Sequence, residues 1–152
     1  MHWVYAKEID LPDFVGGDGT KKAFPSWLSM GEVWALAHYL GNTRLRDATI
    51  DAMLLKMRDF PDLPIVTGSL VAIFNTTPED STIQRLLLEF SAAKVSAAQF
   101  QRDAERLPVA LARFLAVKFL TGQSRPYAVP KFKDRCQYHE HSTDEGCWDQ
   151  KK

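Results

Sequence analysis

Residues 29–59 read SMGEVWALAHYLGNTRLRDATIDAMLLKMRD, and this stretch decides the fold class. Ser29 followed by Glu32 has the spacing of a helix capping box, and apolar residues then recur at helical intervals. Gly41 favours the left-handed conformation that ends a helix, and Thr43 can cap a second helix that continues to the end of the stretch. Because only two residues separate the two predicted helices, we expect a helical hairpin.

The second of these helices is apolar on most of its circumference. Its polar stripe consists of Arg44, Asp47, Asp51 and Arg58. Asp47 and Asp51 lie one turn apart, and we interpret them as part of a solvated face and not as a catalytic pair. A helix with so narrow a polar stripe usually packs on more than one side.

Further helical patterns follow as far as Gly122. They predict a short helix over residues 67–74 and three more helices downstream, so the fold class is mainly α: a small bundle of about five to six helices. Residues 2–5 fit either a short strand or the end of a helix. The predicted starts of the three downstream helices are Ser81 with Gln84, Ser96 with Gln99, and Pro108. We divide the chain into 1–60, a helical extension over 61–122, and a polar tail over 123–152.

Charge and hydropathy exclude several classes of protein. The 152 residues carry 19 Lys and Arg against 19 Asp and Glu, so the formal net charge is +0, which argues against a nucleic-acid-binding protein. The N-terminus lacks a basic region followed by an apolar run, and no stretch has the roughly 20 apolar residues that span a membrane. We therefore expect an intracellular protein of the cytoplasm or nucleus that binds neither nucleic acid nor membrane.

The predicted tail contains a cluster of zinc-ligand residue types. Cys136, His139, His141 and Cys147 match the number and the kinds of ligand in a tetrahedral zinc site, although not the spacing of a standard zinc finger. Two interpretations stay open: a small zinc-binding module, or a polar tail that is disordered unless something holds it.

Catalytic patterns are weak throughout the chain. Cys136 with His139 is the one thiol–imidazole pair, and a flexible tail would give it neither a rigid pocket nor a positioned base. We expect no enzymatic activity and no cofactor apart from the zinc of the alternative interpretation.

The apolar helix faces point instead to protein partners. Apolar surface beyond a single stripe often packs against another protein, although a central position in the bundle would explain it equally. The predicted partner-binding residues, which would also serve self-association, are Met30, Val33, Trp34, Ala37, Leu45 and Met53.

Several segments resemble a known family when they are taken in order. They are residues 3–5 (WVY) with Ile9 and Leu11, residues 32–41 (EVWALAHYLG), 45–52 (LRDATIDA), 75–81 (NTTPEDS) with 85–87 (RLL), and 136–141 (CQYHEH). Together they resemble the C-terminal part of a BTB/POZ domain, its helical extension, and the C-x-YHEH tail of BTB/POZ proteins of filamentous fungi.

The resemblance implies a fold and a function. BTB/POZ domains are helix clusters flanked by a small sheet, and they mediate homodimerisation and, in some members, recruitment of substrates to cullin-type ubiquitin ligases. The strands and helices that open the domain have no counterpart before Trp3, and they carry most of the dimer and cullin surface. The resemblance therefore implies a non-enzymatic interaction protein that lacks the N-terminal half of the domain.

Overall fold

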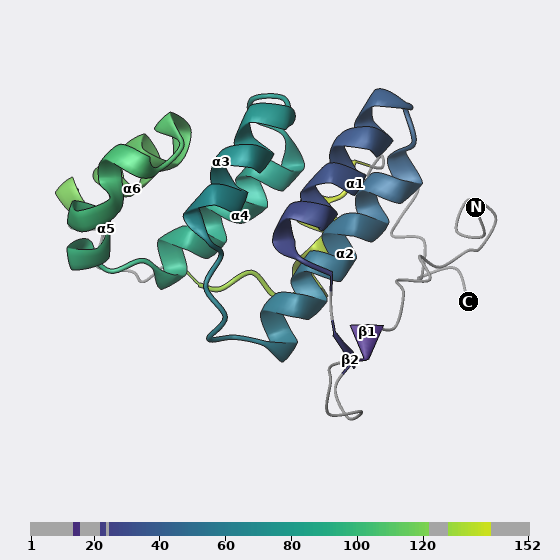
Figure 1. Cartoon of the computed structure of the whole chain (residues 1–152), viewed down its shortest axis with the longest axis horizontal. Coiled ribbons are helices and arrows are strands. Elements are labelled where there is room, and N and C mark those ends of the chain that lie inside the picture. Colours follow the sequence, from purple (N-terminus) through teal and green to yellow (C-terminus); the bar gives the residue numbers. More distant parts are fainter. Residues whose placement is uncertain (1–13, 16–21, 24, 122–127, 141–152) are drawn as a thin grey trace.

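The computed structural model describes residues 14–15, 22–23, 25–121 and 128–140, and this part of the chain is mainly helical. Figure 1 shows three helix pairs side by side, so the predicted small helical bundle is confirmed. The pairs are α1 (Trp27–Tyr39) with α2 (Thr43–Asp59), α3 (Thr67–Thr76) with α4 (Thr82–Lys94), and α5 (Ala97–Asp103) with α6 (Val109–Leu120). Two 3-10 helices, η1 (Ala104–Arg106) and η2 (Phe132–Tyr138), complete the helical elements described.

A two-stranded antiparallel sheet precedes the bundle. It pairs β1 (Phe14–Val15) with β2 (Lys22–Ala23), and Phe14 lies opposite Ala23. The short strand or helix end predicted at residues 2–5 lies outside the described residues.

The hairpin of α1 and α2 forms as predicted, but different residues cap it. The Oγ atom of Ser26 accepts a hydrogen bond from the backbone N–H of Ser29 at 3.0 Å, so the predicted box of Ser29 and Glu32 is wrong. The helix begins earlier because its first residue, Trp27, is buried in the core. Asn42, and not Thr43, caps α2 through its Oδ1 atom, which accepts from Leu45 N–H at 3.0 Å.

Two downstream caps had different outcomes. The box of Ser96 and Gln99 is present at the start of α5, as predicted. The box of Ser81 and Gln84 is wrong, because the buried Gln84 side chain donates through Nε2 to the carbonyl and hydroxyl oxygens of Thr77, both at 3.1 Å. Gln84 therefore ties the start of α4 to the end of α3.

One core joins the three helix pairs. Gly31 lets α1 pack tightly on α3, since a Cβ atom at that position would lie 2.4 Å from Cγ1 of Ile73. Leu111 and Leu115 of α6 are fully buried in the same cluster. Lys118 links α6 to the end of α4, because its Nζ donates to the carbonyl oxygen of Ala92. Among the helices described, none combines the length and the apolar character needed to cross a membrane.

Candidate functional site

Residues 128–140, here called the docking segment, return from the α5–α6 end of the molecule to pack on α2 and α4 (Figure 1). Tyr138 is 1% exposed and His139 is 9% exposed. The polar tail was expected to be disordered unless something holds it, and for these residues the contacts with α2 and α4 provide the hold. The apolar side chains of the segment lie on a 3-10 turn with extended flanks. Their spacing therefore lacks the 3.6-residue period of an α-helix.

Tyr138 anchors the segment to α4. Its hydroxyl donates a hydrogen bond to the carboxylate of Glu89, and the guanidinium of Arg85 lies 5.5 Å from the centre of its ring. Arg85 also donates to the backbone carbonyl of Gln137. Burial is the larger cause, and the hydrogen bond to Glu89 the second, of a pKa of Tyr138 far above its usual value.

His139 and Glu140 anchor the segment to α2. The Nε2 atom of His139 lies 2.9 Å from Oδ1 of Asp51, and the backbone N–H of Glu140 donates to Oδ1 of Asp47 at 3.0 Å. The carboxylate of Glu140 pairs with Arg46. Within the segment, Arg135 Nε lies 3.8 Å from the same oxygen of Asp51.

The interpretation of Asp47 and Asp51 as a solvated helix face is therefore wrong. Asp47 is 2% exposed, and both carboxylates accept hydrogen bonds from the docking segment. Sequence reasoning missed the role of this pair because the segment that covers it lies about 90 residues further along the chain. The one local signal was the spacing of the two carboxylates, one helical turn apart on a largely apolar helix.

We call the receiving face of α2 and α4 the docking surface. It combines carboxylates with guanidinium groups, and each of them faces a complementary group of the docking segment. Its polar members are Arg46, Asp47, Asp51, Thr82, Arg85 and Glu89.

An aromatic stack extends the docking surface toward α1. The ring of His38 stacks on Trp34 with 5.4 Å between centroids, and the guanidinium of Arg46 lies 5.9 Å from the Trp34 ring. Arg46 Nη1 also lies 3.2 Å from Nδ1 of His38. Arg46 therefore connects α1, α2 and Glu140 of the docking segment.

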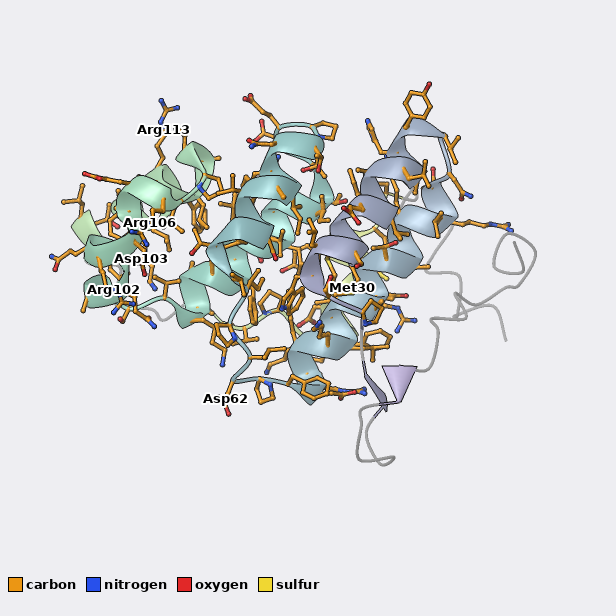
Figure 2. The ribbon with its side chains drawn as sticks, in the orientation of Figure 1. Met30, Asp62, Arg102, Asp103, Arg106 and Arg113 are labelled. Carbon is orange, nitrogen blue, oxygen red and sulfur yellow. The ribbon has the colours of Figure 1, made fainter. Side chains whose placement is uncertain are left out.

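The residues predicted to bind partners lie inside the molecule. Val33 is half-buried, and the other five are buried within the chain, as Figure 2 illustrates for Met30 between the helices. The five are Met30, Trp34, Ala37, Leu45 and Met53. The structure thus places them at the contacts between elements, and the outer face of α1 carries other apolar residues.

The outer face of α1 exposes a stripe of large apolar side chains. Leu36 is 46% exposed, Leu40 is 61% exposed and Tyr39 is 86% exposed. Leu28 is also exposed, in the first turn of α1 and one turn before the exposed Glu32, and Leu40 is the C-cap residue that follows the helix. Exposed aliphatic and aromatic side chains gathered on one helix face are typical of protein-binding surfaces.

The structure brings one of the four predicted zinc ligands into the docking contacts. His139 bonds to Asp51, and Cys136 is disulfide-bonded, so this sulfur is no thiolate ligand in the oxidised chain. His141 and Cys147 lie outside the described residues. Within residues 25–121 and 128–140, no three ligand-type side chains converge as a metal site would require.

Comparison with known proteins adds no assignment: no family model matches the chain, and neither does a curated protein or a solved structure.

Proposed function

We propose that this chain is a non-enzymatic protein–protein interaction protein of the BTB/POZ-like kind, acting inside the cell, in the cytoplasm or nucleus. The exposed stripe, made by Leu28, Leu36 and Tyr39 of α1 and by Leu40 at its C-cap, is the observation that carries the proposal. Leu36, Tyr39 and Leu40 of this stripe belong to residues 32–41, part of the sequence that resembles the helix pair that closes a BTB/POZ domain.

The polar groups of the docking surface support a binding role over a catalytic one. Asp51 bonds to His139, and Glu89 accepts from Tyr138, so the carboxylates that acid–base chemistry would need are engaged in holding the docking segment. These two carboxylates therefore stabilise the fold by binding the docking segment.

A second copy of the chain is the partner we assign to the α1 stripe. With a net charge of +0, two copies meet without net repulsion, and a net charge near zero favours self-association. Pairing of two identical stripes would remove Leu36 and Leu40 from water in both copies, and burial of apolar surface is the main driving force for such association.

Sedimentation velocity tests this proposal over a range of protein concentrations. We expect a concentration-dependent dimer of the wild-type chain, and we expect Leu36→Glu to shift it to monomer because a charge would have to be buried at the interface. Val117→Glu is the matched control, since Val117 is 55% exposed on α6 and lies outside the stripe. A wild-type chain that stays a folded monomer at every concentration would contradict self-association through α1.

A further inference from the structure

We propose that the docking surface of α2 and α4 is a peptide-binding site that accepts the docking segment of a second copy as well as that of its own chain. The inference rests on the proposed interaction function in treating the chain as a self-associating protein, but it uses a surface separate from the α1 stripe. The ligand class is a short peptide with the order aromatic, imidazole, carboxylate, supplied here by Tyr138, His139 and Glu140.

The docking surface and the docking segment are chemically complementary. The docking surface offers a carboxylate to the hydroxyl of Tyr138, a second carboxylate to His139 and a guanidinium to the carboxylate of Glu140. Three successive side chains of the segment thus meet three different partners of matching chemistry. Such a series discriminates between peptide sequences, which a general apolar contact would not do.

The docking surface also binds backbone groups of the docking segment. Asp47 accepts from the backbone N–H of Glu140, and Arg85 donates to the backbone carbonyl of Gln137. Contacts to backbone groups on both sides of Tyr138 and His139 fix the register of the bound peptide. This combination of backbone anchoring and side-chain readout is the usual mode of peptide recognition.

The docking surface is assembled from two helices, α2 and α4. Its members come from helices that lie far from the segment in sequence: Glu89 is 49 residues from Tyr138, and Asp51 is 88 residues from His139. None of these contacts requires that the surface and the segment belong to the same chain, and exchange of identical elements between copies is an inexpensive route to dimers.

Intramolecular docking competes with exchange. A segment on the same chain acts at an effective concentration of roughly millimolar. Exchange therefore becomes visible when the intramolecular contact is broken in one copy, which is the condition that the experiment creates.

The experiment is a complementation between two full-length variants, both carrying Leu36→Glu to remove association through α1. The surface variant carries Asp51→Ala and Glu89→Ala and keeps an intact docking segment. The segment variant carries Tyr138→Ala and His139→Ala and keeps an intact docking surface. Neither variant can dock alone, whereas a mixture contains one matching surface and segment.

We expect sedimentation velocity to show a one-to-one complex in the mixture, with an affinity at least about tenfold tighter than the self-association of either variant alone. Circular dichroism checks that both variants keep their helical content. A mixture of folded variants that contains only monomers would overturn the proposal. Loss of the wild-type dimer in the Leu36→Glu single variant tests only the α1 stripe, so the two proposals can fail separately.

A peptide measurement keeps the test decisive where a double variant unfolds. A fluorescent peptide of residues 128–140, with Cys136→Ser, is added to the single variant His139→Gln and to the wild-type chain. We expect at least about tenfold tighter binding to the variant, whose own segment competes less well. Equal binding to both chains, or binding to neither, would contradict a peptide site on α2 and α4.

Discussion

At the scale of single residues, Gly31 is the position where α1 and α3 tolerate the least change. A Cβ atom there would lie 2.4 Å from Cγ1 and 2.9 Å from Cδ1 of Ile73. We expect Gly31→Ala to destabilise the fold by about 1–3 kcal/mol, because the helices must separate or Ile73 must leave its rotamer. Urea denaturation of the variant measures this loss.

The control for Gly31 is Gly68, in the first turn of α3. A Cβ atom at Gly68 would meet no atom within 4 Å, so Gly68→Ala should keep or increase stability, since alanine is the better helix former. A Gly31→Ala chain as stable as the Gly68→Ala chain would show that α1 and α3 do not pack as the structure has them.

Tyr138 links the stability of the docking segment to alkaline pH. Burial and the hydrogen bond to Glu89 raise the pKa of Tyr138 above its usual value of 10.0. The folded chain therefore holds this proton more tightly than the unfolded chain does. The resulting stabilisation is fully present below pH 10 and is lost as the pH rises toward the higher pKa of the folded state.

We expect Tyr138→Phe to lower the stability at neutral pH by roughly 1–3 kcal/mol, since Glu89 loses its donor. The same change should flatten the decline in stability above pH 10. The comparison between wild type and Tyr138→Phe isolates the contribution of the tyrosine. Parallel pH profiles of the two chains would exclude a role for the Tyr138 proton.

Asp51 and His139 should be energetically coupled. Their side chains are 2.9 Å apart, and residues in direct polar contact show coupling energies of about 0.5–3 kcal/mol. A double-mutant cycle with Asp51→Ala and His139→Ala, read by urea denaturation, measures this energy. Arg135 also approaches Asp51, so a second cycle with Arg135→Ala serves as the comparison, and we expect its coupling to be smaller at 3.8 Å. Additive effects of Asp51→Ala and His139→Ala would mean that the contact contributes nothing to stability.

At the scale of elements, the helices could be predicted from the sequence. The residues that cap them could be predicted only in part. The apolar periodicity of α1 and α2 is local, so the hairpin can be predicted from neighbouring residues. The φ of +65° at Gly41 confirms the left-handed conformation predicted after the end of the first helix. The caps at Ser29 and at Ser81 with Gln84 were wrong for tertiary reasons. Burial of Trp27 moved the first cap, and Gln84 bonds to Thr77 instead of to its own helix end.

The docking segment could be noticed in the sequence but not placed. The cluster of Cys136, His139, His141 and Cys147 stood out by residue type, and zinc was the chemistry that these residue types suggested. The partners that the structure gives it, Asp51 and Glu89, lie on two different helices, and no local pattern connects them to the segment. Long-range pairing of this kind becomes visible only in three dimensions.

The zinc prediction is testable at the same scale. Because Cys136 is disulfide-bonded, we expect the oxidised chain to hold no stoichiometric zinc in metal analysis. Reduction frees the thiol, and the reduced chain with added zinc, compared with its Cys136→Ser variant, decides whether the cluster binds metal. Zinc bound equally by the reduced chain and by Cys136→Ser would exclude Cys136 as a ligand.

At the scale of the whole molecule, the balance of charge extends to the contacts that close the fold. The chain carries 19 residues of each sign, and the docking surface repeats this mixture with carboxylates and guanidinium groups side by side. The α5–α6 end has a similar mixture, where Arg102 pairs with Asp103 at 3.2 Å and lies near Arg106 (Figure 2). Composition predicted the overall balance of charge, but the positions of the buried charges depended on the fold.

The distance in sequence between α2 and the docking segment has a consequence for synthesis of the chain. Asp51 leaves the ribosome 88 residues before His139, and at about 5–20 residues per second this interval lasts roughly 4 to 18 seconds. During that time the hairpin of α1 and α2 can form from local contacts, while Asp47 and Asp51 stay open to water. The nascent chain thus displays an unoccupied docking surface, and any copy already completed nearby can reach it first.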